Sequence, residues 1–455
     1  MSATIVENNL TDSRAGDMTT VEQILGEAVS SAGTPSLNIH YVSHYFPPEV
    51  NAPAIRVSEM AKRWKQLGHS VTVLTGFPNH PTGIIPEEYK GKLHQQEQFE
   101  GIDVHRSYLY AAPNKGIVKR IANYMSFMFS SLICSSWRSG PADVVIGTSP
   151  QFFVAVSAWI TSLLKRAPFV FEVRDLWPEE IVAVGAIKNR LIIRMLEALE
   201  MFLYRRARMV VAVAQGTVDT LVKRGIPAEK IILIPNGVAL ERFNDTDGKK
   251  VRKRFNLNGE FLVSYIGTHG MAHRLETVID AAEQLRDNSR IRFMLVGDGA
   301  EKAKLVARAR EKKLANVTFA DQASADDVPH YYAASDVCLA PLKKTNLFER
   351  NIPSKLYEIM ASECPILLGA NGESKRLVHN AQAGETFEPE NVASLVEKIE
   401  RLFGDRKYSR QLGRQGREFV AQNNRREMLA DKYSAALVSL SKKHTTTDTG
   451  SAKVL

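Results

Sequence analysis

The chain has 455 residues, enough for two or three domains that each bury their own core. Its charged fraction of 24% and hydrophobic fraction of 44% are those of a soluble globular protein and exclude a disordered or fibrous chain. Uninterrupted apolar runs stay shorter than about 18 residues, so we expect no membrane-spanning helix. Cys134, Cys338 and Cys364 lie far apart and no Cys/His cluster accompanies them, which predicts reduced thiols in a cytoplasmic protein.

The formal net charge of +9 is unevenly distributed. Residues 1–36 combine five acidic residues with a single basic one, Arg14, and are predicted to form a flexible extension without the features of a signal peptide. Residues 442–455 are predicted to form a flexible polar tail. The body between them is therefore more basic than the total, which favours an anionic partner such as phospholipid, lipid diphosphate or nucleotide. No DNA- or RNA-binding motif accompanies the charge, so nucleic acid is not expected.

Strands and helices alternate along the first half of the body. Short β-branched runs are typical of parallel strands that are buried on both faces. The predicted strands cover residues 37–42, 71–74, 144–146, 169–173 and 209–213. An amphipathic helix over 54–67 separates the first two. This alternation predicts an α/β fold with a doubly wound parallel sheet.

Three helical segments of this half combine apolar residues with cations. Residues 121–137 follow Lys119 and Arg120, residues 152–164 precede two further cations, and residues 188–208 interleave arginines with aliphatic side chains. Such helices either lie in a membrane interface or are ordinary helices of an α/β domain whose arginines extend their charged ends to water. The sequence leaves both alternatives open.

The alternation restarts after residues 231–243, whose Pro-Asn-Gly sequence is typical of a turn and marks the expected link between domains. The predicted strands of the second half cover residues 261–266, 293–296, 317–319, 337–340 and 365–368, with a helix over 275–285. Two such domains place the carboxyl ends of their strands, and with them the ligand, in the cleft that they share.

The segment 352–361 (IPSKLYEIMA) is the most informative part of the chain. Ser354 is a preferred N-cap residue, and an apolar helical pattern follows it. The amides of residues 355–357 would then be free donors at a helix N-terminus, a position that binds phosphate. Lys355 adds a positive charge, and Glu358 is placed one turn later to accept both hydroxyls of a ribose. These residues indicate a nucleotide-diphosphate site, and the alternative is an ordinary capped helix.

Two segments of the first half end at the expected cleft. Residues 46–53 open a helix after the first strand, so Asn51 and Ala52 are placed to face a diphosphate or sugar, with Asn51 tolerating a left-handed backbone. The alternative is a rigid proline-rich turn. Arg174 and Asp175 follow a buried strand, and a charged pair in a cleft is more often functional than one elsewhere. Their alternative is a local ion pair.

The second half contributes two glycine turns and two basic residues to the same cleft. Gly267 and Gly297 each follow a predicted strand, although either is also an ordinary strand-to-helix turn. His273 and Arg274 stand at the start of the next helix, where they are placed to neutralise a leaving diphosphate. As isolated residues they would be surface charges in most proteins.

Together these residues resemble the retaining glycosyltransferases of family 4, which have the GT-B fold of two Rossmann-like domains facing a cleft. The resemblance covers about residues 37–433. It is carried by FPPEVNAPAIR (46–56), LGHSVTVLTGFPNHPTG (67–83), FEVRDLWPE (171–179), IPNGV (234–238), YIGTHGMAHRLETVIDAA (265–282), VGDG (296–299) and IPSKLYEIMA (352–361). GFPNHPTG and VRDLWPE look like the branch that builds bacterial O-antigen, capsule and colanic-acid-type polysaccharides, including N-acetylfucosamine transferases.

The resemblance implies a nucleotide-sugar donor, most often UDP-linked, and a polyprenyl-diphosphate-linked saccharide acceptor at the anionic cytoplasmic face of the inner membrane. It implies an acceptor-side domain over 37–235, a nucleotide-sugar-binding domain over 236–424, and a helix over 425–441 that crosses back. No metal or other cofactor is expected, since the helix end and its cations would suffice for the leaving diphosphate. That phosphate would accept the proton of the acceptor hydroxyl on the same face of the sugar.

The family's Glu-x7-Glu motif can be carried over in part. Its second glutamate, the ribose binder, falls on Glu358, and its diphosphate-facing helix start falls on Ser354, Lys355 and Leu356. The glycine-rich loop of the family falls on Asn51 and Ala52, the histidine near the transferred sugar on Arg174, and two loops lining the donor on Gly267 and Gly297.

The chain departs from the family pattern in several places. Arg350 stands where the first glutamate of the motif is expected, with Glu349 one residue out of register. His273 occupies a lysine position and Arg274 a position where glycine is usual, so Lys355 or Arg274 is expected to supply charge to the leaving phosphate. A non-catalytic nucleotide-sugar-binding protein and a sugar-nucleotide epimerase remain as alternatives.

Overall fold

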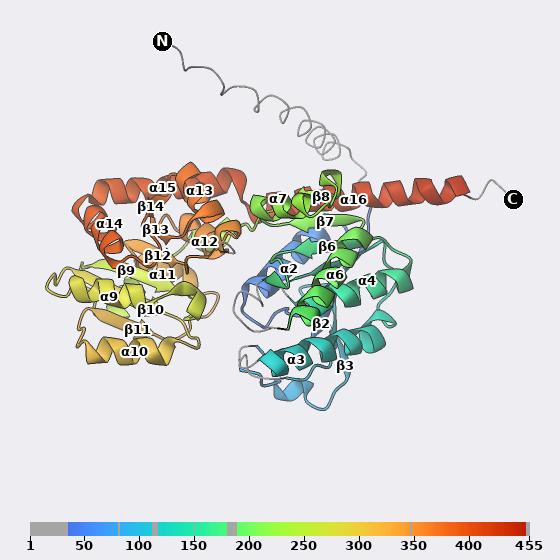
Figure 1. Ribbon diagram of the computed structural model, residues 1–455, viewed down its shortest axis with the longest axis horizontal. Coiled ribbons are helices and arrows are strands. Elements are labelled where there is room, and N and C mark those ends of the chain that lie inside the picture. The colour runs from blue at the N-terminus through green and yellow to red at the C-terminus, as the bar shows by residue number, and fades with distance from the viewer. Residues whose placement is uncertain are drawn as a thin grey trace, which may run out of the picture.

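Two α/β domains make up the part of the chain that the computed structural model describes, residues 35–80, 82–111, 117–149, 151–179, 189–345 and 348–451. In Figure 1 the N-terminal domain lies on the right and the C-terminal domain on the left, each around its own sheet. This architecture confirms the expected α/β fold. The extension predicted over 1–36 lies outside the described residues apart from its last two.

The N-terminal domain is organised around eight strands in the order β3-β4-β2-β1-β5-β6-β7-β8. The strands are β1 Asn38–Val42, β2 Ser70–Gly76, β3 His94–Phe99, β4 Ile102–Ser107, β5 Val144–Thr148, β6 Phe169–Val173, β7 Met209–Ala212 and β8 Ile231–Leu233. β3 runs antiparallel to β4, and every other neighbouring pair is parallel. Of these strands, β3, β4 and β8 were not predicted from the sequence. β3 (HQQEQF) is a polar edge strand, so it lacks the continuous apolar run of a buried strand.

Helices cover both faces of this sheet (Figure 1). α2 (Ala52–Gln66) and α16 (Arg426–Ser451) pack on one face. The other face carries α3 Ile117–Ser130, α4 Phe152–Lys165, α6 Arg190–Arg206 and α7 Gln215–Lys223. A π-helix, Ser131–Ser136, continues α3. No helix of the described residues is long and apolar enough to span a membrane.

The chain passes between the domains twice, and the two passages are joined to each other. Val238 and Arg425 form a parallel β-bridge, in which the Val238 amide donates to the Asn424 carbonyl at 3.0 Å. The Arg426 amide donates back to the Val238 carbonyl, also at 3.0 Å. The buried Arg56 guanidinium donates to the carbonyls of Ile234 and Pro235 at 3.1 and 2.9 Å. The interdomain link predicted over 231–243 therefore narrows to the residues around 234–238, because 231–233 form β8.

α16 returns the end of the chain to the N-terminal domain. Its Ala430 carbonyl accepts from the Trp64 indole N–H at 2.9 Å, and the Trp64 ring contacts Tyr433 edge to face. The helix begins at Arg426 and continues to Ser451, so the prediction of a flexible tail from residue 442 is wrong over 442–451. Between 426 and 449 neither proline nor glycine interrupts the helical pattern.

The C-terminal domain has a six-stranded parallel sheet in the order β11-β10-β9-β12-β13-β14. Its strands are β9 Phe261–Ile266, β10 Ile291–Val296, β11 Val317–Ala320, β12 Val337–Pro341, β13 Ile366–Gly369 and β14 Gly384–Thr386. Its helices are α8 Gly248–Arg254, α9 Glu276–Gln284, α10 Lys302–Glu311, α11 Val328–Ala334, α12 Lys355–Ala361, α13 Gly372–Asn380, α14 Val392–Gly404 and α15 Arg406–Asn423. Two apolar clusters fill the space on either face of the sheet.

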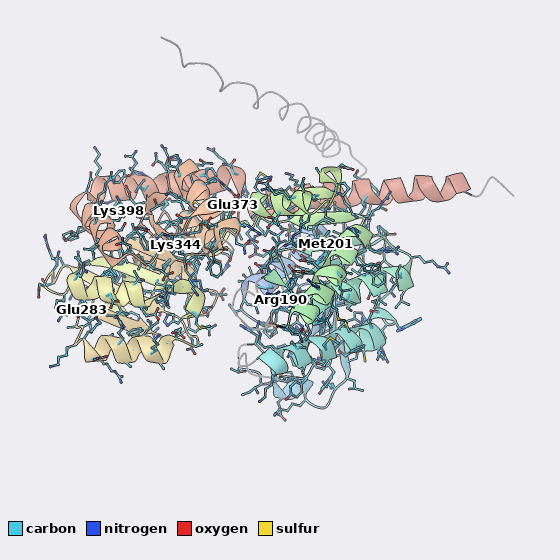
Figure 2. The ribbon with its side chains drawn as sticks, in the orientation of Figure 1. Arg190, Met201, Glu283, Lys344, Glu373 and Lys398 are labelled. Atoms are coloured by element: carbon cyan, nitrogen blue, oxygen red, sulfur yellow. The ribbon has the colours of Figure 1, made fainter. Side chains whose placement is uncertain are left out.

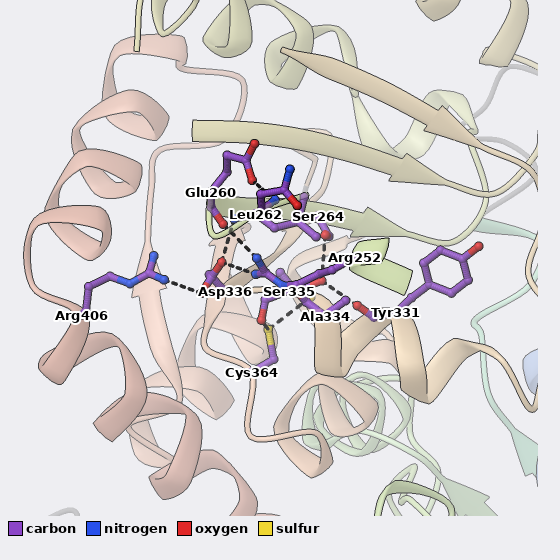
Figure 3. Close-up of polar contacts among 12 residues, drawn as sticks. Arg252, Glu260, Leu262, Ser264, Tyr331, Ala334, Ser335, Asp336, Cys364 and Arg406 are labelled. Carbon is purple, nitrogen blue, oxygen red and sulfur yellow. Dashed lines mark hydrogen bonds and ion pairs between the residues drawn. The ribbon is translucent and has the colours of Figure 1, made fainter. Parts of the chain in front are cut away.

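A polar network anchors this domain at the amino edge of its sheet (Figure 3). The Asp336 carboxylate, just before β12, accepts from Arg252 of α8 and from Arg406 of α15, both at 2.6 Å, and from the Leu262 amide at 2.8 Å. Two helices and two strands are thereby held together at one end of the sheet. The opposite, carboxyl edge is left for the loops that carry the candidate site.

Candidate active site

Two glycine turns meet at the carboxyl edge of the C-terminal sheet. Gly267 follows β9 and Gly297 follows β10, both with φ at +139°, which favours glycine. A Cβ atom at Gly297 would lie 2.0 Å from the Gly267 carbonyl oxygen, and one at Gly267 would lie 2.7 Å from Lys355 Nζ. The two turns therefore touch, and the Lys355 ammonium reaches them from α12.

Lys355 places a positive charge at this edge. Its Nζ donates to the Ile266 carbonyl at 3.1 Å and lies 4.0 Å from the centroid of the Tyr265 ring. Burial lowers the pKa of Lys355 to about 8, against the opposing effect of the Glu358 carboxylate. At pH 7 the amine is still mostly protonated, so it supplies a poorly solvated cation beside two backbone turns.

Glu358 lies one turn further along α12. The Tyr332 hydroxyl approaches its carboxylate at 3.5 Å. Burial raises the pKa of Glu358, while Arg242, Arg426 and Lys355 act to lower it. α12 thus presents a cation and a carboxylate from adjacent turns of one rigid element.

The expected role of Ser354 as a side-chain cap is wrong. Ser354 has a helical backbone (φ −58°, ψ −29°), and its side chain makes no capping hydrogen bond. The amides of Leu356 and Tyr357 donate to the Pro353 and Ser354 carbonyls, each at 3.1 Å, so they are not free donors. The turn begins at Pro353, which favours a tight 3-10-type start and moves Ser354 inside it. The positive charge of this helix start therefore rests chiefly on Lys355.

His273 and Arg274 differ in what they offer. Burial, together with the Lys355 charge, lowers the pKa of His273 to about 3, and its Nδ1 lies 3.4 Å from the Pro341 carbonyl oxygen. Without a ligand, His273 is therefore neutral and adds no positive charge to this edge. Arg274 is exposed and its Nε donates to Glu390 at 3.0 Å, so its charge is already paired.

Asn51 does not use the left-handed backbone that the sequence suggested. Its φ of −145° is extended, and its Oδ1 caps α2 by accepting from the Ala54 amide at 2.9 Å. A side-chain cap satisfies the helix start without a glycine turn. The buried Nδ2 of Asn51 has no hydrogen-bond partner among the described residues, and Ala52 beside it is exposed.

Arg174 is a buried cation at the carboxyl end of β6. Only 9% of its surface is exposed, and its Nε and Nη1 lack hydrogen-bond partners among the described residues. Burial and the neighbouring Arg56 lower its pKa, while Glu172 and Asp175 raise it. The Arg174 amide donates to Ser149 Oγ at 2.8 Å, which fixes the backbone. Asp175 faces the other domain, since its Oδ1 accepts from Asn351 Nδ2 at 3.5 Å.

Arg350 and Glu349 do not share one role. Arg350 Nη1 pairs across the domain boundary with Glu179 Oε2 at 3.1 Å. Glu349 instead lines a pocket with Lys343 and Lys344. Glu179 lies in the motif VRDLWPE, but the sequence did not single it out as a site residue. The charged residues that follow the buried strand were the available signal, and only Arg174 and Asp175 among them were predicted to be functional.

Two family models together cover most of the chain. The one described as "Glycosyl transferase 4-like domain" matches residues 51–237, and the one described as "Glycosyl transferases group 1" matches residues 247–419. The protein is a glycosyltransferase. The boundary between the two models falls at the paired passages that join the two sheets.

Sequence and structure comparisons agree with this assignment. The glycosyltransferase is 27% identical over 371 residues to the putative colanic acid biosynthesis glycosyl transferase WcaI of Escherichia coli K12, covering 78% of this chain and 89% of WcaI. Its fold matches sucrose-phosphate synthase from Thermosynechococcus elongatus with a TM-score of 0.69 at 18% identity, covering 92% and 100% of the two chains. Anabaena HepE in complex with UDP and glucose matches with a TM-score of 0.64 at 16% identity, covering 91% and 100%.

The arrangement gives the glycosyltransferase three groups from two domains. Lys355 and Glu358 come from α12 of the C-terminal domain, and Arg174 stands at the carboxyl end of β6 in the N-terminal domain. Among the described residues, no group of three or more His, Cys, Asp or Glu side chains is arranged to hold a metal ion.

Proposed function

We propose that the glycosyltransferase moves a sugar, with retention, from a UDP-sugar to a lipid-linked saccharide acceptor in bacterial surface polysaccharide synthesis. Two similar proteins support this direction: WcaI is a putative colanic acid biosynthesis glycosyl transferase, and the structural neighbour HepE is in complex with UDP and glucose. The lipid carrier of the acceptor is a polyprenyl diphosphate, as the resemblance in the motifs implies.

The position of Lys355 carries the donor part of the proposal. Its ammonium lies against the Gly267 turn, at the carboxyl edge where α/β domains bind nucleotides. A diphosphate placed there would meet a cation whose charge is little shielded by water, and phosphate binding would in turn raise the lysine pKa. Glu358, on the next turn, would accept the ribose hydroxyls.

Charge stabilisation is the main catalytic contribution that these residues can make. As the bond from the anomeric carbon to the phosphate oxygen breaks, negative charge grows on the leaving diphosphate and Lys355 lies ready to stabilise it. The departing phosphate oxygen takes the proton of the acceptor hydroxyl, so no separate protein base is required. Arg174, two of whose nitrogens have no hydrogen-bond partner in the described part of the chain, would face the reaction from the other domain.

The acceptor is expected at a membrane surface, and one face of the N-terminal domain fits that role. α4 packs on both of its neighbours: Ser157 bonds Ser131 of the π-helix at 2.6 Å, and Trp159 contacts Phe202 of α6 edge to face. The membrane-facing surface, as we define it, comprises the exposed apolar residues Phe129, Ile133, Trp137, Leu163, Leu164, Leu191, Ile192 and Met195. The same helices carry exposed cations, namely Lys119 and Arg120 on α3 and Arg190, labelled in Figure 2, at the start of α6.

A ligand screen followed by a transfer assay tests the proposal. UDP should raise the melting temperature more than GDP or ADP, because a ligand that binds only the folded state stabilises it. A panel of UDP-sugars should then identify a donor whose turnover depends on a polyprenyl-diphosphate saccharide, with the anomeric configuration retained in the product. Preferential stabilisation by GDP would reject the UDP assignment, and transfer to water alone would reject the lipid-linked acceptor.

A further inference from the structure

A row of alternating charges crosses the boundary between the domains. Arg350 of the C-terminal domain pairs with Glu179 Oε2 at 3.1 Å, and Arg224, directly after α7, bonds the other oxygen of Glu179. Arg224 also bonds the buried Glu200 of α6 at 3.0 Å, and Glu200 accepts from the Tyr204 hydroxyl at 2.7 Å. Glu179 is thus the acidic residue through which two arginines, one from each domain, are held together.

The backbone around Arg350 is equally confined. A Cβ atom at Gly216, in the first turn of α7, would lie 3.2 Å from the Cα, Cβ and carbonyl oxygen of Arg350, so only a glycine lets the two segments approach this closely without adjustment. On its other side, Gly372 has φ at +67°, and a Cβ there would lie 1.9 Å from the Glu349 carbonyl oxygen. Residues 348–351 therefore lie between α7 of one domain and α13 of the other.

The next residue continues the contact toward the candidate site. Asn351 bonds Asp175 across the boundary at 3.5 Å, and its carbonyl accepts from Ser374 Oγ of α13 at 2.9 Å. Four residues further along the chain stands Lys355, whose ammonium lies at the Gly267 turn. The interdomain contacts and the proposed phosphate cation therefore belong to one short stretch of chain.

We infer that Glu179 is a positioning residue for sugar transfer. By pairing with Arg350 it fixes residues 348–351, and with them the start of α12, against the acceptor-side domain. This inference rests on the proposed function, because the groups aligned are those assigned to the donor and acceptor. It also gives Arg350 a role at the position where the resemblance led us to expect a glutamate.

The ion pair between Arg350 and Glu179 is partly exposed, so its effect on domain alignment can be distinguished from its effect on folding stability. The side chains of Arg350 and Glu179 are 38% and 36% exposed, and ion pairs of that exposure contribute little to the stability of a folded protein. Alignment is different, since a displacement of about 1 Å at a reacting centre lowers turnover by up to about a hundredfold. Losing the pair should therefore affect turnover far more than folding.

Variants at Arg350 test the inference through turnover and nucleotide affinity. With UDP-glucose as donor, Arg350→Gln and Glu179→Gln should each lower kcat about tenfold. Affinity for UDP, measured by calorimetry, should stay within about twofold, because Lys355 and Glu358, the residues proposed to hold UDP, both belong to α12 of the C-terminal domain. Arg350→Lys should retain most of the activity, and the double variant should be no worse than either single one. Arg286→Gln, which breaks an exposed pair with Glu283 on α9, is the matched control and should change nothing.

A distance measurement tests the same inference without any substrate. Spin labels on cysteines introduced at Lys90 and Arg310, in a Cys134→Ser background, report the separation of the domains. Arg350→Gln and Glu179→Gln should broaden or shift the distance distribution, whereas Arg286→Gln should not. Unchanged distributions would overturn the inference, as would unchanged kcat in an active enzyme. Failure of UDP-glucose turnover in the unmodified protein would count against the proposed donor, and the distance result would still decide the role of Glu179.

Discussion

At the scale of single residues, Lys355 is the group on which the donor site depends most. Replacing it with methionine keeps most of the volume of the side chain and removes the charge. We expect UDP affinity to fall about tenfold or more, in line with the loss of a charge-assisted contact to phosphate. Calorimetry with UDP measures this directly. Arg274→Ala is the comparison. If this variant loses more UDP affinity than Lys355→Met, the cation that contacts the phosphate is Arg274 and not Lys355.

The low pKa of Lys355 adds a pH dependence to UDP binding. The amine of the free protein loses its proton as the pH rises through about 8, whereas an ordinary lysine would keep it. UDP affinity should therefore weaken between pH 7 and pH 9, and the Lys355→Met variant should lose that dependence. An equal slope in both proteins would assign the titration to another group.

Glu358 makes a separate prediction on the same helix. Glu358→Gln keeps the shape of the side chain but replaces one acceptor oxygen with a donor group. Donor affinity and turnover should both fall, by about tenfold, because a carboxylate offers one charged acceptor oxygen to each of two ribose hydroxyls, whereas an amide has a single, uncharged acceptor oxygen. Affinity for inorganic diphosphate, which has no ribose, should be unchanged. Tyr332→Phe, which removes only the neighbouring hydroxyl, serves as the control.

At the scale of helices, the membrane-facing surface gives a prediction that is independent of catalysis. Trp137 is 72% exposed, which is unusual for the largest apolar side chain unless a partner covers it. Charge reversal at Lys119 and Arg120, or Trp137→Ser, should weaken binding to liposomes that contain anionic lipid. Co-sedimentation measures the effect, and vesicles of neutral lipid give the baseline. Binding that is unaffected by all three changes would exclude this surface.

Some strands and site residues could be predicted from the sequence, and others could not. Buried parallel strands such as β1, β6 and β9 were predictable because continuous β-branched runs mark them. The edge strand β3 carries no such signal. It pairs with β4 alone and is partly exposed to water, so its side chains are mostly polar. At the site, Lys355 and Glu358 could be found from local pattern. The contact between Arg350 and Glu179 could not be predicted, since the two residues are 171 positions apart along the chain.

At the scale of the whole molecule, buried titratable groups set the response to acid. Burial holds five histidines neutral by lowering their pKa from 6.5 to about 4 for His40, His105 and His269 and about 3 for His44 and His273. In the unfolded chain they bind protons below pH 6.5, so stability is lost as the pH falls through that value, by about 1.4 kcal/mol per histidine at pH 5.5. Glu49 and Glu200, whose pKa burial raises to about 7, act in the opposite direction over the same range.

The histidines outnumber these carboxyls, so we expect a net loss of stability between pH 7.5 and pH 5.5. Urea unfolding at the two pH values measures the loss. His44 is packed among the rings of Tyr45, Tyr124 and Phe127, so His44→Phe suits that environment and removes one protonation site. The variant should lose about 1.4 kcal/mol less than the unmodified protein on acidification. An equal loss in both proteins would mean that His44 is not among the groups responsible.

The paired passages between the domains restrict how this molecule can open. The two segments that join at Val238 and Arg425 can bend together. Twisting one domain relative to the other would instead stretch both hydrogen bonds of the bridge. Arg56 adds further resistance, because its guanidinium holds the first passage by two carbonyls. The domains should therefore open and close by rotation about a single hinge axis. Each closure would bring Glu179 back to the same arginine, and a lipid-tethered acceptor would meet the donor in the same orientation every time.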